Sequence, residues 1–325
     1  MERGDIDPNS SDNIGRTPLS FAAERGQAAL VKLLLARGDI DPNASDNNGR
    51  VPFSFAVERF RESDDFRSPY SSASRHEGVM KLFLERGNID HNSPDNNGRT
   101  LLSFVAEKGS EGITKLLLER GDIDPNSSDN NGRTPLSFAA ERGQEVITKL
   151  LLERGDVDPN SPDGDGRTPL SFAAERGQEV IVKLLLERGT VDPNSPDGNG
   201  RTPLSFAAER GQEGIVKLLL KRGDVDPNSP DGNGRTLLSF AAGRGQGDAV
   251  KLFLERGDVD PNSSDNNGRT PLSFAAERGG EGVLVPGHKY PKMEGDHSYG
   301  GTDTHGCFAI YFFNPCFRVL MAWDK

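Results

Sequence analysis

One short phrase, Gly-Arg-Thr-Pro-Leu-Ser-Phe, recurs along this chain and constrains its fold more than any other feature of the sequence. Six of the seven intervals between its copies are 34 residues, and the remaining interval is 49. A fixed period of about 20–50 residues is typical of stacked repeats, in which each repeat contacts its neighbours along one direction. We therefore predict a repeat solenoid. The phrase, or a close variant of it, begins at Gly15, Gly49, Gly98, Gly132, Gly166, Gly200, Gly234 and Gly268.

The first half of each repeat predicts a short helix. In the copy at residues 166–199, the Thr168 side chain can accept a hydrogen bond from free backbone N–H groups. Pro169 suits the first helical position, where no N–H bond is lost. Gly177 is expected to end the helix, because glycine adopts a left-handed conformation at little cost.

The second half of the same copy predicts a longer helix and a turn. The helix is expected from about Gln178 to Arg188, with Ile181, Val182, Leu184 and Leu185 as a buried stripe. Gly189 is expected to stop it, again through the conformational freedom of glycine. Residues 190–199 are rich in Asp, Asn, Pro, Ser and Gly, which favours a projecting turn.

This unit resembles the ankyrin repeat. The resemblance rests on Asp-Gly-Asn-Gly-Arg-Thr-Pro-Leu-Ser-Phe-Ala-Ala at 197–208, followed by a second helix and a glycine, and it covers about residues 1–285. It implies an all-α repeat solenoid of about eight helix–turn–helix layers with projecting β-hairpin-like turns. The phrase and the Asp-Pro-Asn connection look most like the long arrays of filamentous-fungal proteins, which are often attached to NTPase-type receptor modules.

Two departures from the family pattern are visible. Serine, for example Ser20, Ser137 and Ser205, stands where the family usually has histidine, so the Thr–His hydrogen bond of that family is not expected. The period also exceeds the usual 33 residues by one, and the extra residue is assigned to the Asp-Val-Asp-Pro-Asn connection.

The repeats set the expected domain boundaries. Residues 1–14 match the hairpin end of a repeat, residues 15–285 form the array, and an insertion at 60–74 is expected to be an exposed loop. Residues 286–325 share nothing with the repeats. This tail is expected to be poorly ordered, with an improvised cap on the last layer or a gene-model artefact as the alternatives.

Composition excludes several classes of protein. The formal charge of −11 disfavours nonspecific binding to nucleic acid or to an anionic membrane. No basic start followed by an apolar run is present at the N-terminus, and the apolar stretch at 307–323 is interrupted by polar residues and proline. Both cysteines lie in the last twenty residues, so the repeats need no disulfide. These features predict an intracellular, cytoplasmic protein, with the nucleus also open.

No motif for catalysis, metal binding or cofactor binding stands out. The stretch 109–115 lacks the Gly-Lys-Ser/Thr ending of a P-loop, and the acidic turn at 156–166 lacks the offsets of a calcium loop. The histidines and cysteines of the tail match no zinc spacing, and the repeats hold too few histidines for a hydrolase triad. Arg-Gly-Asp occurs six times, each time where a helix meets a turn, so we assign its glycine to backbone conformation rather than to adhesion. We therefore predict no enzyme, no cofactor and no small-molecule substrate.

The resemblance does predict a partner-binding surface. Partners of ankyrin-like arrays usually contact the hairpin tips and the inner face of the first helix. In this sequence that surface comprises the arginine before the threonine, the Glu-Arg pair that ends the first helix, and the tip residues. The candidate residues are Arg99, Asn130, Asn131, Arg133, Glu141, Arg142, Arg167, Glu175, Arg176, Arg201, Glu209, Arg210 and Arg235.

Two interpretations of the arginine ladder stay open. Each arginine could pair with a nearby Asp or Glu in a solvated ladder, or the ladder could grip an extended acidic or repetitive peptide through bidentate contacts. The predicted function is a non-catalytic protein–protein interaction scaffold for an unidentified protein or peptide. The alternative is the recognition arm of a larger NTPase-type signalling receptor, present here as a fragment or a split gene product.

Overall fold

The computed structural model describes residues 7–60, 72–86 and 89–277, and all regular structure in them is α-helical. The helices come in pairs, one pair per repeat, as the period predicts, and the eighth repeat contributes one more first helix. This confirms the all-α ankyrin-type array of about eight layers. The elements are α1 Pro18–Glu24, α2 Ala28–Leu35, α3 Pro52–Arg59, α4 Ser72–Leu84, α5 Leu101–Lys108, α6 Glu111–Leu118, α7 Pro135–Arg142, α8 Glu145–Glu153, α9 Pro169–Arg176, α10 Glu179–Glu187, α11 Pro203–Arg210, α12 Glu213–Leu220, α13 Leu237–Arg244, α14 Gly247–Leu254 and α15 Pro271–Glu277.

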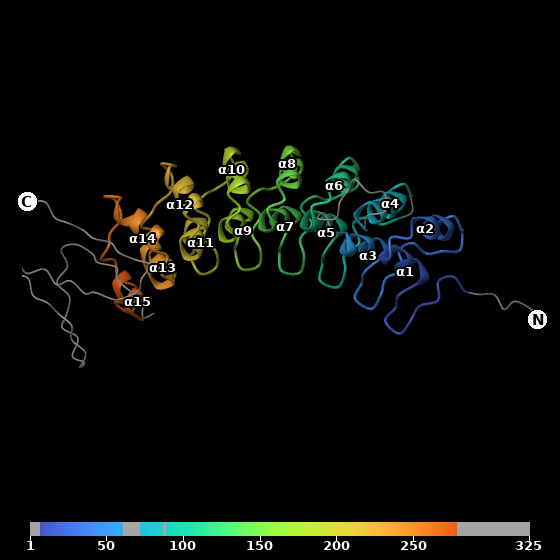
Figure 1. Ribbon diagram of the computed structural model, residues 1–325, viewed down its shortest axis with the longest axis horizontal. Coiled ribbons are helices and arrows are strands. Elements are labelled where there is room, and N and C mark those ends of the chain that lie inside the picture. Colours follow the sequence, from blue (N-terminus) through green and yellow to red (C-terminus); the bar gives the residue numbers. More distant parts are fainter. Residues whose placement is uncertain (1–6, 61–71, 87–88, 278–325) are drawn as a thin grey trace, which may run out of the picture. The chain divides into compact units, whose positions relative to one another are not determined.

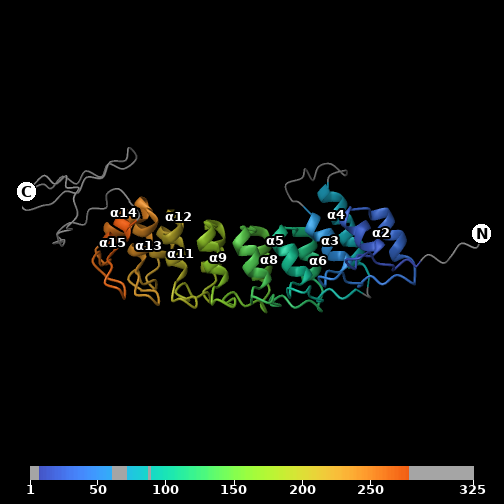
Figure 2. The ribbon, with the colours of Figure 1, turned by 90° about the horizontal axis from the view of Figure 1, so that it is seen from below.

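The array divides into two compact units. Unit 1 comprises residues 1–173 and 178–192, and unit 2 comprises residues 174–177 and 193–325. Within unit 1 the first helices α1, α3, α5 and α7 pack side by side, and the second helices α2, α4, α6 and α8 form a parallel row behind them (Figures 1 and 2). Unit 2 repeats this arrangement, with α11, α13 and α15 in one row and α12 and α14 in the other.

The first helices begin and end as the sequence predicts. At α7 the backbone N–H of Ser137 donates to Thr134 Oγ1 at 3.3 Å, and Pro135 occupies the first helical position. Gly143 ends the helix with φ +74°, in the left-handed region. The two buried hydroxyl groups of Thr134 and Ser137 lie 3.2 Å apart and share a hydrogen bond. A Thr–Ser hydrogen bond thus takes the place of the family's Thr–His hydrogen bond, which was not expected here.

The second helices end differently from the prediction. In α10 the last helical residue is Glu187, and Arg188 follows with φ −78° and ψ 106°. Gly189 is not among the glycines with positive φ, so the prediction that its conformational freedom stops the helix is wrong. A Cβ at Gly189 would meet no atom within 4 Å. What ends the helix is the turn of the chain into the extended conformation at Arg188.

The arginine of each described Arg-Gly-Asp triplet has a structural role in the turn after the second helix. Arg120 forms a fork-shaped ion pair with its own Asp122, with Nε–Oδ1 3.0 Å and Nη2–Oδ2 2.9 Å. In the next copy, Arg154 also donates from Nη1 to the backbone oxygen of Leu118, at the end of α6, at 2.8 Å. The triplet therefore closes on itself and caps the second helix of the preceding layer.

The Asp-Pro-Asn turns connect neighbouring layers. The amide of Asn126 donates to the backbone oxygen of Asp156 at 2.6 Å and accepts from the N–H of Asp158 at 3.0 Å. Asn160 makes the same pair of bonds one layer later, to Thr190 and Asp192. The turn composition predicted a turn, but not this interlayer bridge.

The hydrophobic core lies between the two rows of helices in each unit. Of the predicted stripe in α10, Ile181, Val182 and Leu185 are buried, whereas Leu184 is only half-buried. Phe60, the first residue of the expected exposed loop, is also buried, and α4 already begins at Ser72. The loop prediction is thus wrong at both ends of the insertion. Residues 61–71 and the predicted tail at 286–325 lie outside the described residues.

Glycine at the hairpin tip is predicted to be essential for stability. Gly132 has φ +79°, and a Cβ there would lie 2.8 Å from the backbone nitrogen of Gly164 in the next hairpin. Gly132→Ala should therefore lower the free energy of unfolding by about 1–3 kcal/mol from backbone strain alone, and the contact adds to this. The measurement is urea unfolding followed by circular dichroism.

Gly155→Ala is the matched control for this change. Gly155 does not have a positive φ, and a Cβ there would meet nothing within 4 Å. Its stability should stay within about 0.5 kcal/mol of the parent chain. Equal losses in the two variants would contradict the assignment of the two glycines.

A buried histidine replaces proline in one Asp-Pro-Asn turn. His91 is 3% exposed and packs edge-on against Phe53 with 6.1 Å between ring centroids. Neither ring nitrogen has a hydrogen-bond partner of ordinary geometry among the described residues. Burial lowers the pKa of His91, and the charge of Arg120 lowers it further. The carboxylates of Asp122 and Asp90 and the backbone of Ile89 oppose the shift without cancelling it.

This lowered pKa predicts an acid-sensitive layer. The unfolded chain takes up the proton near pH 6.5, whereas the folded chain takes it up only at lower pH. Stability is therefore fully present above about pH 6.5 and falls as the pH drops through that value towards the folded pKa. His91→Pro restores the residue of the other turns and should remove this loss. The melting temperatures of the two chains should diverge below pH 6.5, and parallel curves would contradict the prediction.

Candidate protein-binding surface

The hairpin tips are tightly hydrogen-bonded turns. At the tip of the fourth repeat, Asp129 Oδ1 accepts from the backbone N–H groups of Asn131 at 2.9 Å and of Arg133 at 2.8 Å. Asn130 donates from its backbone and its side chain to the preceding hairpin, with its Nδ2 2.9 Å from the oxygen of Asn96. Asn130 and Asn131 are exposed. The structure therefore places the predicted tip residues Asn130 and Asn131 at the surface, in a hydrogen-bonded turn.

The arginines before the threonine adopt two arrangements. A bridging arginine lies over the phenylalanine of its own layer and of the next, and it pairs with the glutamate that ends its own first helix. Arg133 is of this kind: it pairs with Glu141 at 2.5 Å and lies 4.2 Å from the Phe138 centroid and 4.5 Å from the Phe172 centroid. Its Nε is buried and has no hydrogen-bond partner among the described residues. The bridging arginines are Arg16, Arg99 and Arg133.

An own-layer arginine lies over one phenylalanine only and pairs with the aspartate four residues before it. Arg201 lies 4.5 Å from the Phe206 centroid, with its Nη2 2.8 Å from Asp197 Oδ2. Arg235 repeats this geometry with Phe240 and Asp231. Arg50 and Arg269 are also own-layer arginines, and Arg167 lies over Phe172 with Asp163 at 3.5 Å.

The glutamate near the end of several first helices joins two arginines. Glu107 accepts from Arg99 of its own layer at 2.7 Å and from Arg142 of the next layer at 2.7 Å. Burial alone would raise the pKa of Glu107, but these two guanidinium groups hold it below its usual value. In unit 2, Glu209 similarly joins Arg201 and Arg244. The predicted arginines and glutamates thus pair with one another, as the first of the two interpretations expects, in which each arginine pairs with a nearby Asp or Glu.

The exposed charges on this ladder are the cations. The side chain of Arg142 is 56% exposed, whereas its partner Glu107 is 15% exposed. In unit 2 the Arg210 side chain is 53% exposed against 14% for Glu175. Arg176 is also exposed. The surface offers guanidinium groups to solvent, although the chain as a whole is acidic.

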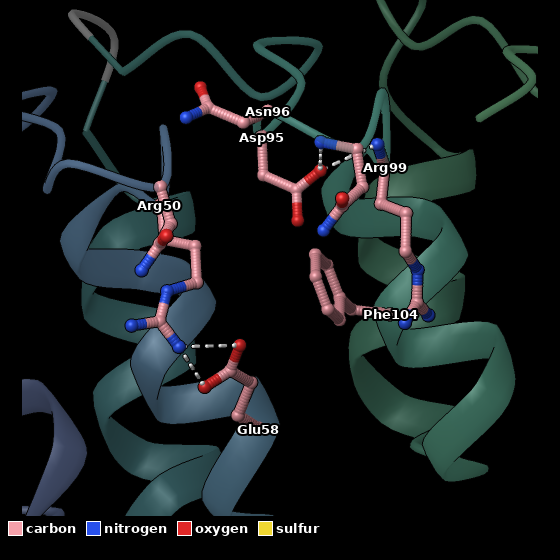
Figure 3. A pocket seen from close by; sticks show the side chains of 8 residues that line it. Arg50, Glu58, Asp95, Asn96, Arg99 and Phe104 are labelled. Atoms are coloured by element: carbon pink, nitrogen blue, oxygen red, sulfur yellow. Dashed lines mark hydrogen bonds and ion pairs between the residues drawn. The ribbon is translucent and has the colours of Figure 1, made fainter. Parts of the chain in front are cut away.

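A polar pocket of about 270 Å³ lies between the second and third layers of unit 1 (Figure 3). Arg50 and Glu58 of the second layer face Asp95 and Phe104 of the third. Of its lining residues, only Arg99 is among those predicted from the sequence, because the pocket depends on the side-chain conformations of neighbouring arginines. The pocket is lined by Asn48, Arg50, Glu58, Asp95, Asn96, Asn97, Arg99 and Phe104.

Two other kinds of feature are absent from the described part of the chain. It contains no group of three or more His, Cys, Asp or Glu side chains able to hold a metal ion. None of its helices is long and apolar enough to cross a membrane.

Comparison with protein families identifies the repeats. The family described as ankyrin repeats (3 copies) matches residues 70–163 and 147–231, and that described as ankyrin repeats (many copies) matches residues 1–56 and 219–275. The comparison with curated proteins gave no match. Ankyrin repeats are typically non-catalytic and generally serve as protein–protein interaction modules. With matches over most of its length and paired helices in every full repeat, the chain belongs to the ankyrin repeat family.

Proposed function

We propose that this protein is a non-catalytic scaffold that binds an acidic segment of a partner protein. The contact surface comprises the hairpin tips and the exposed ends of the first helices. The observation that carries this proposal is the unequal exposure of the ladder. In unit 1 the Arg59 side chain is 61% exposed while its partner Glu24 is 18% exposed, and Arg142 with Glu107 repeats the pattern. A carboxylate that approaches this surface meets guanidinium groups first.

In this proposal some arginines of the ladder have a structural role and others contact the partner. Arg99 and Arg133 lie over the rings of two layers and hold those layers together. Arg167, Arg201 and Arg235 lie over the ring of their own layer and contribute positive potential. The exposed arginines at the helix ends make the direct contacts. The tip side chains Asn130 and Asn131 border the same surface and hydrogen-bond the partner's backbone. Because the repeats need no disulfide, we place this binding in the cytoplasm.

Removing two exposed arginines tests the proposal. The full chain should bind fluorescein-labelled polyglutamate with an affinity that falls as salt rises. The double variant Arg59→Gln/Arg142→Gln should bind it about tenfold more weakly, because two charge-assisted contacts are lost. Fluorescence anisotropy measures both affinities, and circular dichroism checks the fold.

The matched control removes two exposed positive charges from the other row of helices. Lys115 and Lys149 are each 47% exposed and pair only with glutamates of their own helices. Lys115→Gln/Lys149→Gln changes the net charge by the same amount. It should leave binding nearly unchanged. An equal loss in both double variants would mean that net charge, not this surface, attracts the peptide.

A further inference from the structure

Three phenylalanine rings in the first helices of unit 1, those of Phe55, Phe138 and Phe172, each lie between two guanidinium groups, whereas Phe21 in the first layer contacts one. Phe138 lies between Arg99, at 4.3 Å, and Arg133, at 4.2 Å. Phe55 lies between Arg16, at 4.8 Å, and Arg50, at 4.6 Å. The protein thus shows what these ring faces bind, since the face of an aromatic ring attracts a cation.

Phe104 departs from this pattern. Arg99 covers it at 4.1 Å, but no second guanidinium group of the described residues reaches its other face. Arg50, the arginine of the preceding layer, lies instead over Phe55 and pairs with Asp46 at 2.7 Å and Glu58 at 3.1 Å. The uncovered face of Phe104 consequently forms a wall of the pocket shown in Figure 3.

Asp95 supplies a carboxylate oxygen to the same pocket. Only 9% of the residue is exposed, and its Oδ1 accepts from the backbone N–H groups of Asn97 and Arg99. No described protein group bonds to its Oδ2, which points towards Phe104 in Figure 3. In the second layer the equivalent oxygen of Asp46 bonds to Arg50. At the third layer Arg99 is a bridging arginine and has turned away from Asp95.

We infer that this pocket receives an arginine side chain from the partner. Its guanidinium group would stack on the uncovered face of Phe104 and donate to Asp95 Oδ2. Arg201 combines the same two kinds of contact in unit 2, there as the arginine of its own layer, with Phe206 at 4.5 Å and Asp197 at 2.8 Å. The inference rests on the proposed function and sharpens it: the partner segment is acidic but carries one arginine.

The two resident arginines do not prevent this binding. Arg50 is neutralised by Asp46 and Glu58, and Arg99 by Glu107. Phe138 already carries a guanidinium group on each face, so two cations on opposite faces of one ring are compatible with this fold. Asn48 and Asn97 also line the pocket, and an asparagine side-chain oxygen can accept a hydrogen bond from the remaining N–H groups.

The test uses a small probe on the full chain. N-acetyl-arginine amide should shift the backbone amide NMR signals of Asn48, Asn97 and Arg99 in a saturable way. N-acetyl-citrulline amide, which has the same shape without the charge, should not. Asp95→Asn and Phe104→Leu should each weaken binding by about fivefold or more.

Asp129→Asn is the matched control, because the ring beside it, Phe138, is covered on both faces. It should bind the probe like the parent chain. Absence of binding to the parent chain, equal binding of citrulline, or no effect of Asp95→Asn would overturn the inference. If the arginine probe fails this test but polyglutamate still binds, only the inference fails and the proposed function stands. If polyglutamate binding is lost while the arginine probe still binds, only the proposed function fails.

Discussion

Replacing Phe172 with alanine is expected to lower the free energy of unfolding by about 3–5 kcal/mol. The ring is 1% exposed and lies in α9 between the guanidinium groups of Arg133, at 4.5 Å, and Arg167, at 4.2 Å. Truncation leaves a cavity between neighbouring first helices and removes two cation–π contacts at once. Because a repeat array is stabilised by its layer interfaces, damage to one interface weakens both adjoining layers.

Phe172→Leu separates the two contributions. Leucine fills much of the volume but offers no ring face, so a loss of about 1–2 kcal/mol is expected. Urea unfolding of both variants, followed by circular dichroism, gives the comparison. If the alanine variant unfolds within about 0.5 kcal/mol of the parent chain, Phe172 does not hold the layers together as its burial indicates.

Local signals in the sequence predicted the fold well where one residue type had one physical task. The Thr-Pro start of α7 and the left-handed Gly143 at its end follow from capping and from the freedom of glycine. The same rule failed at Gly189, where the backbone does not enter the left-handed region. Composition marked both positions as turns but could not tell which glycine carries a positive φ.

The insertion shows a second limit. A polar, serine-rich stretch predicted an exposed loop, yet Phe60 packs inside and Ser72 already belongs to α4. The aromatic side chain of Phe60 was the available sequence signal that the stretch begins inside the core. His91 gave a clearer signal of an unusual layer, because it replaces proline in a turn that is otherwise Asp-Pro-Asn.

The candidate surface was predictable as a list of residues but not as an arrangement. In the second and third repeats the arginine is offered three partners: the aspartate before it, the glutamate after it and the rings beside it. Since all three are present in both repeats, the sequence alone does not choose among them. Arg50 takes the aspartate and Arg99 takes the glutamate. The pocket at Phe104 exists only because these adjacent choices differ.

Reversing the charge of a bridging arginine should therefore damage the fold, not only binding. The Arg133 side chain is 19% exposed and is enclosed by Glu141, Phe138 and Phe172. A carboxylate in its place would face Glu141 and the negative faces of two rings. We expect Arg133→Glu to lower the free energy of unfolding by about 2–4 kcal/mol, somewhat less than for a fully buried pair because solvent still reaches the group.

Arg142→Glu is the matched reversal, because Arg142 is 56% exposed and Glu107 keeps its second partner, Arg99. Its cost should stay near about 0–1 kcal/mol, while binding of polyglutamate falls. Urea unfolding and anisotropy on both variants separate a structural arginine from a contact arginine. An Arg133→Glu chain that has parental stability but no longer binds polyglutamate would instead make the bridging arginines themselves the contact residues. The ladder would then serve mainly to bind the partner and only secondarily to hold the layers together.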